Sequence, residues 1–247
     1  MNKKMDLIVK EKVEWLEQKT RDAGMKGLIV GLSGGIDSAV VANLIKRAVP
    51  DQSMAVILPI SSNEKDIEDA LKVAKKIDIH FEILDLTDTH QKMMRQITEL
   101  PGLKTVIGSP TQKIADANLR ARLRMSALYA IANAMNYLVV GTDNAAELYT
   151  GYFTKYGDGG VDLLPIADLL KRDVYNMARY LEIPESILNK DPSAGLWDGQ
   201  TDEEELGISY QKIDDYLAGK DISEKDKEII RNLHKKTQHK REMPPVP

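Results

Sequence analysis

A glycine-rich hexapeptide, SGGIDS at residues 33–38, is the part of this 247-residue chain whose residue types point most clearly to chemistry. Its two glycines let the backbone approach an anion closely, and the N–H groups that begin a following helix bind negative charge. Ser33 and Ser38 can add hydroxyl donors. The segment lacks both the GxxxxGK[ST] and the GxGxxG patterns. We interpret it as a phosphate-binding loop; the alternative is a glycine-rich turn in which Asp37 only begins a helix.

Two carboxylates could hold a metal ion beside this loop. Asp37 lies inside it, and Glu147 follows the apolar run YLVVGT at 137–142. If the runs before the two acids are parallel strands, both side chains lie at the carboxyl edge of one sheet, where an open α/β sheet binds its ligand. Mg²⁺ takes one or two carboxylates together with phosphate oxygens and water, which suits the pair. Acids that stabilise the N-termini of two helices are the alternative.

The surrounding segments indicate how these residues are positioned. The apolar runs that predict buried strands are 27–32, 54–60, 80–86 and 137–142. The segments with helical spacing are 3–22, 36–48, 63–77 and 116–135. Strands that alternate with helices predict an α/β fold, a doubly wound and mostly parallel Rossmann-like sheet flanked by helices.

The last third of the chain has a different character. Helical spacing recurs at 169–181, 208–217 and 223–236, with no strand pattern. Residues 191–207 are rich in Gly, Pro, Ser and acidic residues, and we expect a mobile loop that covers bound substrate. We predict a single domain over residues 1–247, with a core at 24–190 and C-terminal helices at 208–247.

Composition excludes several classes of protein. With 34 Lys and Arg against 38 Asp and Glu, the formal net charge is −4, which argues against a general nucleic-acid-binding protein. The absence of cysteine excludes disulfides, thiolate metal sites and thiol nucleophiles. No apolar run approaches the ~20 residues that span a bilayer, and the N-terminus lacks the apolar region of a signal peptide. We expect a cytoplasmic protein without a membrane partner.

The loop and four later blocks resemble a known family. SGGIDS after a strand is similar to the pyrophosphate-binding loop of the ATP pyrophosphatases. The later blocks are GTDNAAELYTGYFTKYGDGGVDLLPIADLLKRDV (141–174), DPSAGLW (191–197), ELGISYQKIDDYL (205–217) and HKR (239–241). In this order, and over residues 27–241, they resemble ammonia-dependent NAD synthetases.

The resemblance implies a fold similar to that of the adenine nucleotide alpha hydrolases and a ligase that uses ATP as co-substrate and Mg²⁺ as cofactor. Such an enzyme adenylates the nicotinate carboxylate of deamido-NAD and releases pyrophosphate. Ammonia then attacks the acyl adenylate to give NAD and AMP. A homodimer with the substrate site near the interface is implied as well.

The resemblance also implies roles for individual residues. It implies that Asp37 and Glu147 are the magnesium ligands. The residues implied to contact ATP are Gly31, Leu32, Ser33, Gly34, Gly35, Ile36, Asp37, Ser38, Thr142, Lys171 and Ser193. Those implied to contact deamido-NAD are Arg122, Lys155, Asp162, His239 and Lys240. Ser193 stands where many relatives have threonine and keeps the hydroxyl group.

Asp158, within KYGDGG, is our candidate catalytic residue. Ammonium is abundant at neutral pH, but its lone pair is blocked. A carboxylate that binds the cation and accepts its proton therefore fits the chemistry. An ordinary Asp-Gly turn is the alternative.

Three arginines in NLRARLRMS could form a basic patch, but helical geometry divides them. At ~100° per residue, Arg120 and Arg124 share one face and Arg122 points nearly opposite. Of the three, the resemblance implies that Arg122 contacts deamido-NAD. We expect Arg120 and Arg124 to form surface ion pairs.

Other functions are weighed against this one. Glutamine-dependent NAD synthetases carry an additional domain with a cysteine nucleophile, for which this chain has neither the length nor a cysteine. Sulfur-transferring tRNA enzymes also need thiols, and the KYGDGG and ELGISY blocks do not fit GMP synthetase. A nucleotide-binding module without catalytic activity is the alternative from a different class. The presence of both Asp37 and Glu147 argues against it, because a module that only binds need not position a metal ion.

Overall fold

The computed structural model describes residues 2–103, 107–190, 192 and 201–246. At its centre is a parallel sheet in the order β3-β2-β1-β4. The strands are β1 (Gly27–Gly31), β2 (Ser53–Ile57), β3 (His80–Ile83) and β4 (Tyr137–Val140). β1 pairs with β2 on one side and with the distant β4 on the other, so the strand order reverses at the carboxyl ends of β1 and β4.

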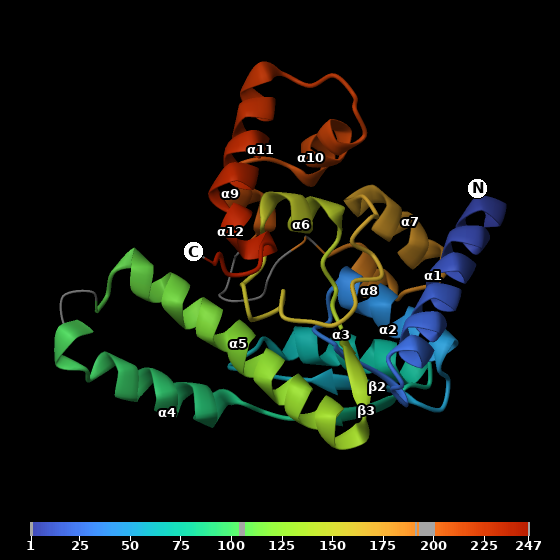
Figure 1. Ribbon diagram of the computed structural model, residues 1–247, viewed down its shortest axis with the longest axis horizontal. Coiled ribbons are helices and arrows are strands. Elements are labelled where there is room, and N and C mark those ends of the chain that lie inside the picture. Colours follow the sequence, from blue (N-terminus) through green and yellow to red (C-terminus); the bar gives the residue numbers. More distant parts are fainter. Residues whose placement is uncertain (1, 104–106, 191, 193–200, 247) are drawn as a thin grey trace.

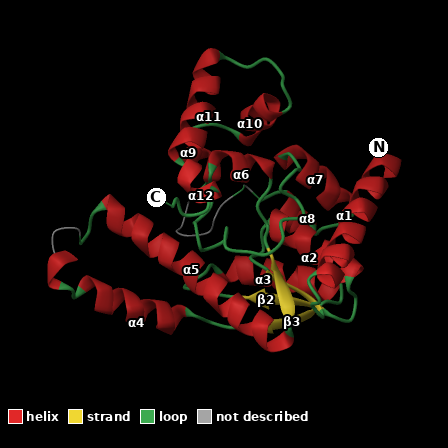
Figure 2. Cartoon of the chain, in the orientation of Figure 1, coloured by secondary structure: helices red, strands yellow, loops and turns green. Residues whose placement is uncertain are grey.

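Helices cover both faces of the sheet (Figure 1, Figure 2). One face shares a hydrophobic core with α1 (Asn2–Asp22), α2 (Ile36–Ala48), α3 (Glu64–Lys76) and α7 (Lys171–Tyr180). The long helix α5 (Pro110–Met135) packs on the other face, against β1 and β4. The predicted doubly wound parallel α/β fold is confirmed.

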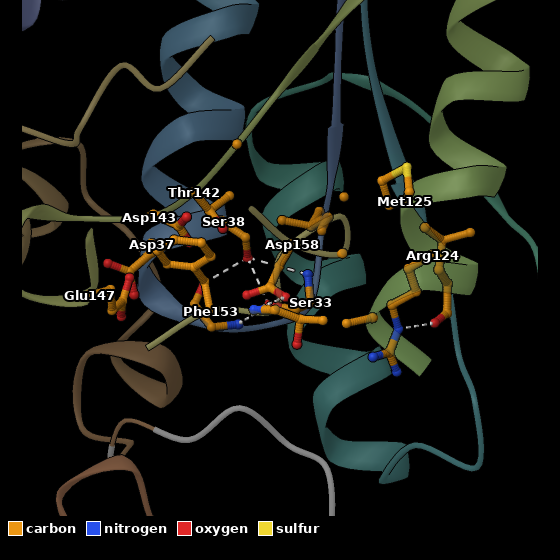
Figure 3. A pocket seen from close by; sticks show the side chains of 18 of the residues that line it. Ser33, Asp37, Ser38, Arg124, Met125, Thr142, Asp143, Glu147, Phe153 and Asp158 are labelled. Atoms are coloured by element: carbon orange, nitrogen blue, oxygen red, sulfur yellow. Dashed lines mark hydrogen bonds between the residues drawn. The ribbon is translucent and has the colours of Figure 1, made fainter. Parts of the chain in front are cut away.

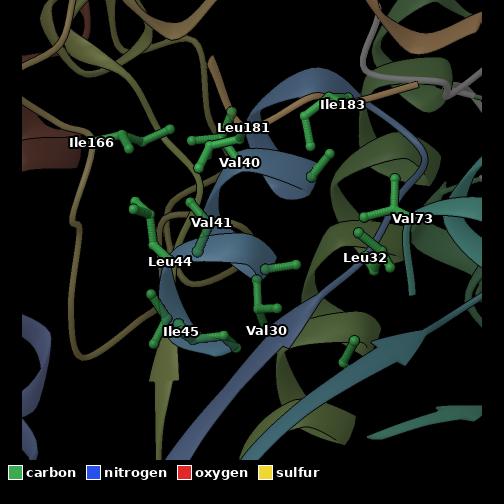
Figure 4. Close-up of a cluster of buried hydrophobic side chains, with 14 of the residues drawn as sticks. Val30, Leu32, Val40, Val41, Leu44, Ile45, Val73, Ile166, Leu181 and Ile183 are labelled. Atoms are coloured by element: carbon green, nitrogen blue, oxygen red, sulfur yellow. The ribbon is translucent and has the colours of Figure 1, made fainter. Parts of the chain in front are cut away.

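The side chains of β1 explain why its sequence is continuously apolar. Leu28 and Val30 enter the core on the α2 face, part of which Figure 4 shows, and Ile29 enters the core on the α5 face. All three are fully buried. A parallel strand covered on both faces has no polar side to alternate with.

The segment between β3 and β4 contains more helix than we predicted. α4 (Thr87–Thr98) follows β3, and a 3₁₀ turn (Pro101–Leu103) follows α4. α5 begins six residues before the predicted start, because Ser109 caps it by accepting a hydrogen bond from the Gln112 N–H and Pro110 fits its first turn. α4 packs against α5, and Figure 1 shows the two helices extending away from the rest of the molecule.

The described part of the C-terminal third is helical, as predicted. Its elements after α6 (Ala145–Thr150) and α7 are α8 (Glu185–Leu188), α9 (Asp202–Leu206), α10 (Tyr210–Leu217), α11 (Glu224–Lys236) and α12 (Gln238–Arg241). α6, α10 and α11 share a third core that includes Ala146, Ile213 and Ile230. Within the predicted covering loop, 202–206 form α9, whereas 191 and 193–200 lie outside the described residues. The extent of the single domain stays a prediction. Searching the described helices reveals none with the length and apolar character to cross a bilayer.

Candidate active site

A cavity of about 470 Å³ opens at the carboxyl ends of β1 and β4, where the strand order reverses. Its walls come from the loop between β1 and α2, from α5, from the segment 140–161 and from α7. Figure 3 shows the polar side chains that point into it. This is the position that the sequence analysis assigned to the ligand.

The predicted phosphate loop joins β1 to α2, and its shape requires glycine. Gly34 has φ +81°, and a Cβ atom there would lie 2.3 Å from the carbonyl oxygen of Asp66. Gly35 caps α2 in an extended conformation, with no side chain occupying the first N–H groups of the helix. These N–H groups at the cavity are available to an anion.

The two serines of the loop hold its shape. Ser38 Oγ donates to the Gly35 carbonyl at 3.0 Å and accepts from the Ser33 N–H at 3.2 Å. The two hydroxyl oxygens lie 3.1 Å apart, and Ser33 Oγ also accepts from the Gly35 N–H at 3.2 Å. Both hydroxyls therefore already have partners within the loop.

Asp37 and Glu147, the predicted carboxylate pair, lie together at the cavity and share one lysine. Lys171 Nζ is 2.7 Å from Asp37 Oδ2 and 3.2 Å from Glu147 Oε1. Only 3% of Lys171 is exposed. Burial opposes its charged form, but the two carboxylates outweigh burial and raise its pKa. The structure therefore brings all three residues to one point, although 134 positions separate Asp37 from Lys171.

Further hydrogen bonds fix the orientation of the two carboxylates. Asn144 caps α6 in a capping box with Glu147, and its side-chain amide donates to Asp37 Oδ1 at 3.0 Å. The Tyr210 hydroxyl lies 3.0 Å from both Glu147 Oε1 and Asp202 Oδ2. Burial raises the pKa of Glu147 to about 7, although Lys171 lowers it.

Asp158 is in the cavity wall, where it also closes a turn; its catalytic role stays a prediction. Its carboxylate accepts a hydrogen bond from the Thr154 N–H at 3.0 Å and so closes a turn. It also lines the cavity, where solvent still reaches it. Burial of the carboxylate in the cavity wall raises the pKa of Asp158, and the hydrogen bond from the Thr154 N–H opposes this effect.

Asp143 is a cavity residue that the sequence analysis missed. It follows Thr142, which also lines the cavity, and the residue is 5% exposed. Burial raises the pKa of Asp143 well above its usual range, and so do the nearby charges of Asp158, Glu147 and Asp37. The sequence signal that could have identified Asp143 is its position just beyond the carboxyl end of a buried strand.

The residues expected to contact deamido-NAD divide into three groups. Lys240 lines the cavity and donates to the carbonyl oxygens of Gly151 (2.7 Å) and Phe153 (2.6 Å). Arg122, Lys155 and His239 lie together beside this wall: Arg122 donates to the Lys155 carbonyl at 3.3 Å, and Lys155 Nζ donates to that of His239.

Asp162 is the third group of the residues expected to contact deamido-NAD, and Ser193 is the remaining residue expected to contact ATP. The Asp162 carboxylate accepts from the Val139 N–H at 2.8 Å and from the Tyr129 hydroxyl at 2.9 Å, so it supports β4 and is not among the cavity residues. Ser193 lies outside the described residues.

The expectation of a surface ion pair at Arg124 is wrong. Arg124 lines the cavity, and its Nε donates to the Leu58 carbonyl at 2.9 Å. Burial, together with Arg120, lowers its pKa to about 10. Arg120 does pair with Asp116, at 2.8 Å, and also donates to the Ile60 carbonyl at 2.8 Å. The shared helix face was predicted correctly, but that face packs beside the end of β2.

Comparisons with known proteins show the family of the chain. A family model described as NAD synthase matches residues 8–244. The NH(3)-dependent NAD(+) synthetase of Alkaliphilus metalliredigens is 56% identical over 97% of both chains, and that of Carboxydothermus hydrogenoformans is 48% identical over 95% of this chain and 94% of the relative. Among solved structures, the NMN synthetase of Francisella tularensis is 39% identical with a TM-score of 0.91 and 98% of both chains covered. The resemblance drawn from the sequence blocks is confirmed.

Proposed function

The chain belongs to the NAD synthase family as an ammonia-dependent ligase, and from this premise we propose that it converts deamido-NAD to NAD through an acyl adenylate. ATP and ammonia are the other substrates, Mg²⁺ is the cofactor, and AMP and pyrophosphate are released. We also propose that it works in the cytoplasm.

The convergence of Asp37, Glu147 and Lys171 beside the phosphate loop supports this proposal most strongly. The N–H groups that begin α2 bind the β and γ phosphates, and Lys171 neutralises phosphate charge. The nicotinate carboxylate attacks the α-phosphorus and pyrophosphate leaves. Because no covalent bond to the protein forms, these residues act by positioning and charge stabilisation.

Asp37 and Glu147 fit a magnesium ion. Their oxygens already share one cation, the ammonium group of Lys171, so both point to the same place. Two carboxylates leave positions for phosphate oxygens and water, as Mg²⁺ prefers. When bound, Mg²⁺ supplies positive charge to the phosphate oxygens.

Asp158 serves the second step in this proposal. Its carboxylate binds ammonium at the cavity wall and accepts one proton, which frees the nitrogen lone pair. The nitrogen then forms the amide bond as the bond between the acyl carbon and AMP breaks, and a second proton is released. The raised pKa of Asp158 favours proton acceptance.

Product analysis tests the function. Incubation with ATP, Mg²⁺, ammonium and deamido-NAD should yield NAD, AMP and pyrophosphate. Formation of ADP, or no turnover, would contradict the proposal and would favour another nucleotide chemistry or a module that only binds.

We predict that Asp37→Asn lowers kcat about 100-fold or more, because one oxygen donor to the metal loses its charge. Circular dichroism should show an unchanged fold. Asp221→Asn is the matched control, because this exposed carboxylate lies between α10 and α11, where it pairs with Lys227, and is not among the cavity residues. Full turnover of Asp37→Asn at saturating Mg²⁺ would show that the metal lies elsewhere.

Nicotinate mononucleotide is a second candidate substrate. The similar solved structure from Francisella tularensis, with a TM-score of 0.91, is that of an NMN synthetase. The chemistry at the carboxylate is the same for both substrates, which differ in whether an AMP half must be bound. The ratio of kcat/KM for deamido-NAD to that for nicotinate mononucleotide decides between them; we expect a ratio above ten.

We propose a homodimer with the substrate site near its interface. Helices α4 and α5 and the segment between them have four exposed large apolar side chains. These are Met93, Leu100, Ile107 and Ile114, and Ile114 also lines the cavity. Exposed apolar side chains grouped in this way mark an interaction surface. Light scattering should give twice the chain mass, and a monomer at micromolar concentration would contradict the proposal.

A further inference from the structure

Asp143 has a combination of properties that its neighbours lack. It is 5% exposed, it lines the cavity, and no hydrogen bond or ion pair reaches its carboxylate from the residues that the structure describes. A buried carboxylate without a partner is costly to the fold. Figure 3 shows its side chain in the cavity that also contains Asp158.

The other charged groups of the cavity are already engaged. Lys171 neutralises Asp37 and Glu147, and the Thr154 N–H donates to Asp158. Lys240 attracts Asp143 electrostatically, but its ammonium group donates to the carbonyl oxygens of Gly151 and Phe153. Asp143 is therefore left for a cation that arrives with the substrates.

The arrangement favours a cation that donates hydrogen bonds over a second metal ion. Across the described residues, no group of three or more His, Cys, Asp or Glu side chains converges closely enough to hold a metal. Ammonium needs fewer ligands, because each N–H can donate to one carboxylate oxygen. Asp158, which lines the same cavity, offers the second carboxylate.

We propose that Asp143 binds the ammonium substrate, beside Asp158, and so holds it at the cavity before it attacks the acyl group. This inference rests on the proposed function. It assigns four of the acids that line the cavity to the two half-reactions: Asp37 and Glu147 act in adenylation, and Asp143 and Asp158 act in amidation.

The two half-reactions provide the test. Adenylation needs no ammonia and is followed by exchange of labelled pyrophosphate into ATP in the presence of Mg²⁺ and deamido-NAD. Asp143→Asn should keep this exchange within about twofold of the unaltered protein. Its KM for ammonium in the complete reaction should rise about tenfold or more, because a charge-assisted hydrogen bond is lost.

The fold and the alternatives are checked with matched variants. Asp143→Asn should unfold at a temperature no lower than the unaltered protein, because the carboxylate has no partner to lose. Asp143→Ser is a second variant on which the same KM rise must be seen, and Asp221→Asn is the exposed control. Loss of exchange in Asp143→Asn, or an unchanged KM for ammonium, would overturn the assignment. Absence of exchange in the unaltered protein would overturn the proposed function and this inference with it.

Discussion

At the scale of single residues, the site depends on backbone shape as much as on side chains. Gly34 combines a positive φ with a carbonyl oxygen where a Cβ atom would stand. Gly219, at the end of α10, has φ +72° but nothing within 4 Å of a built Cβ. The two glycines therefore separate the cost of backbone strain from the cost of a steric clash.

We predict that Gly219→Ala lowers the free energy of unfolding by about 1–2 kcal/mol, the cost of a left-handed alanine. Gly34→Ala should lower it further and should also weaken ATP binding at least tenfold, because the loop must move away from Asp66. Urea unfolding and calorimetric titration with ATP measure the two effects. Equal stabilities, or unchanged ATP affinity in Gly34→Ala, would contradict the role of this loop.

Local sequence predicted some site residues and missed others for a physical reason. The loop at 33–38 and the strands that precede Asp37 and Glu147 depend on short-range patterns, and the structure brings the two carboxylates together as expected. The isolation of Asp143 depends on what its neighbours bond to, and that is a property of the packed structure. The roles of the residues predicted to contact substrate stay predictions. Asp162 also has a structural role, because its carboxylate accepts hydrogen bonds from the Val139 N–H and the Tyr129 hydroxyl.

At the scale of elements, helical periodicity predicts which residues share a face of a helix, but not what that face packs against. It placed Arg120 and Arg124 together, yet only the packing of α5 shows that they meet the carbonyl groups of Ile60 and Leu58. α4 escaped prediction because its buried face is small: His90 is its single buried residue among those described. An amphipathic pattern is weak when one residue carries it.

His90 predicts a pH dependence for the packing of α4 on α5. Its Nε2 lies 3.2 Å from Asp116 Oδ1 without hydrogen-bond geometry. Burial lowers its pKa, and Asp116 opposes this only in part. The folded protein therefore resists protonation, so stability is present above the ordinary pKa of about 6.5 and is lost as pH falls below it.

Urea unfolding between about pH 7.5 and about pH 5 measures this loss, at most about 1.4 kcal/mol per pH unit. His90→Gln should lose less stability over this range than the unaltered protein does. His80→Gln, on the exposed strand β3, should follow the unaltered protein. Parallel curves for all three proteins would exclude His90 as the cause.

Helix α10 reaches Glu147 through Tyr210, whose hydroxyl lies 3.0 Å from both Glu147 and Asp202. We predict that Tyr210→Phe costs about 1–3 kcal/mol, because buried carboxylates lose a donor. The Mg²⁺ concentration for half-maximal activity should rise several-fold as Glu147 loses its orientation. Tyr180→Phe, which removes an exposed hydroxyl bonded to Asp6, is the control and should leave both quantities unchanged.

At the scale of the whole molecule, an acidic chain must bind anionic substrates. The net charge is −4, and seven acidic residues line the cavity: Asp37, Asp66, Asp143, Glu147, Asp158, Asp202 and Glu205. The positive end of α2, with Lys171, Lys240 and Arg124, offsets part of this charge. Attraction of the substrates is therefore a local effect at the cavity.

Removal of divalent ions tests how far the fold depends on its ligands. Dialysis against a chelator should abolish turnover, and added Mg²⁺ should restore it. The unfolding temperature should stay within about 2 °C of the untreated value, because Lys171 still neutralises Asp37 and Glu147. A large drop in this temperature would show that the fold needs the metal.

Lys171 is a counter-ion for Asp37 and Glu147 that is part of the chain, so dialysis cannot remove it. If Asp37 and Glu147 hold Mg²⁺, as we propose, they would have to release Lys171 to do so. The phosphate oxygens of ATP would offer Lys171 new acceptors. The two carboxylates would therefore become available to the metal when the nucleotide binds.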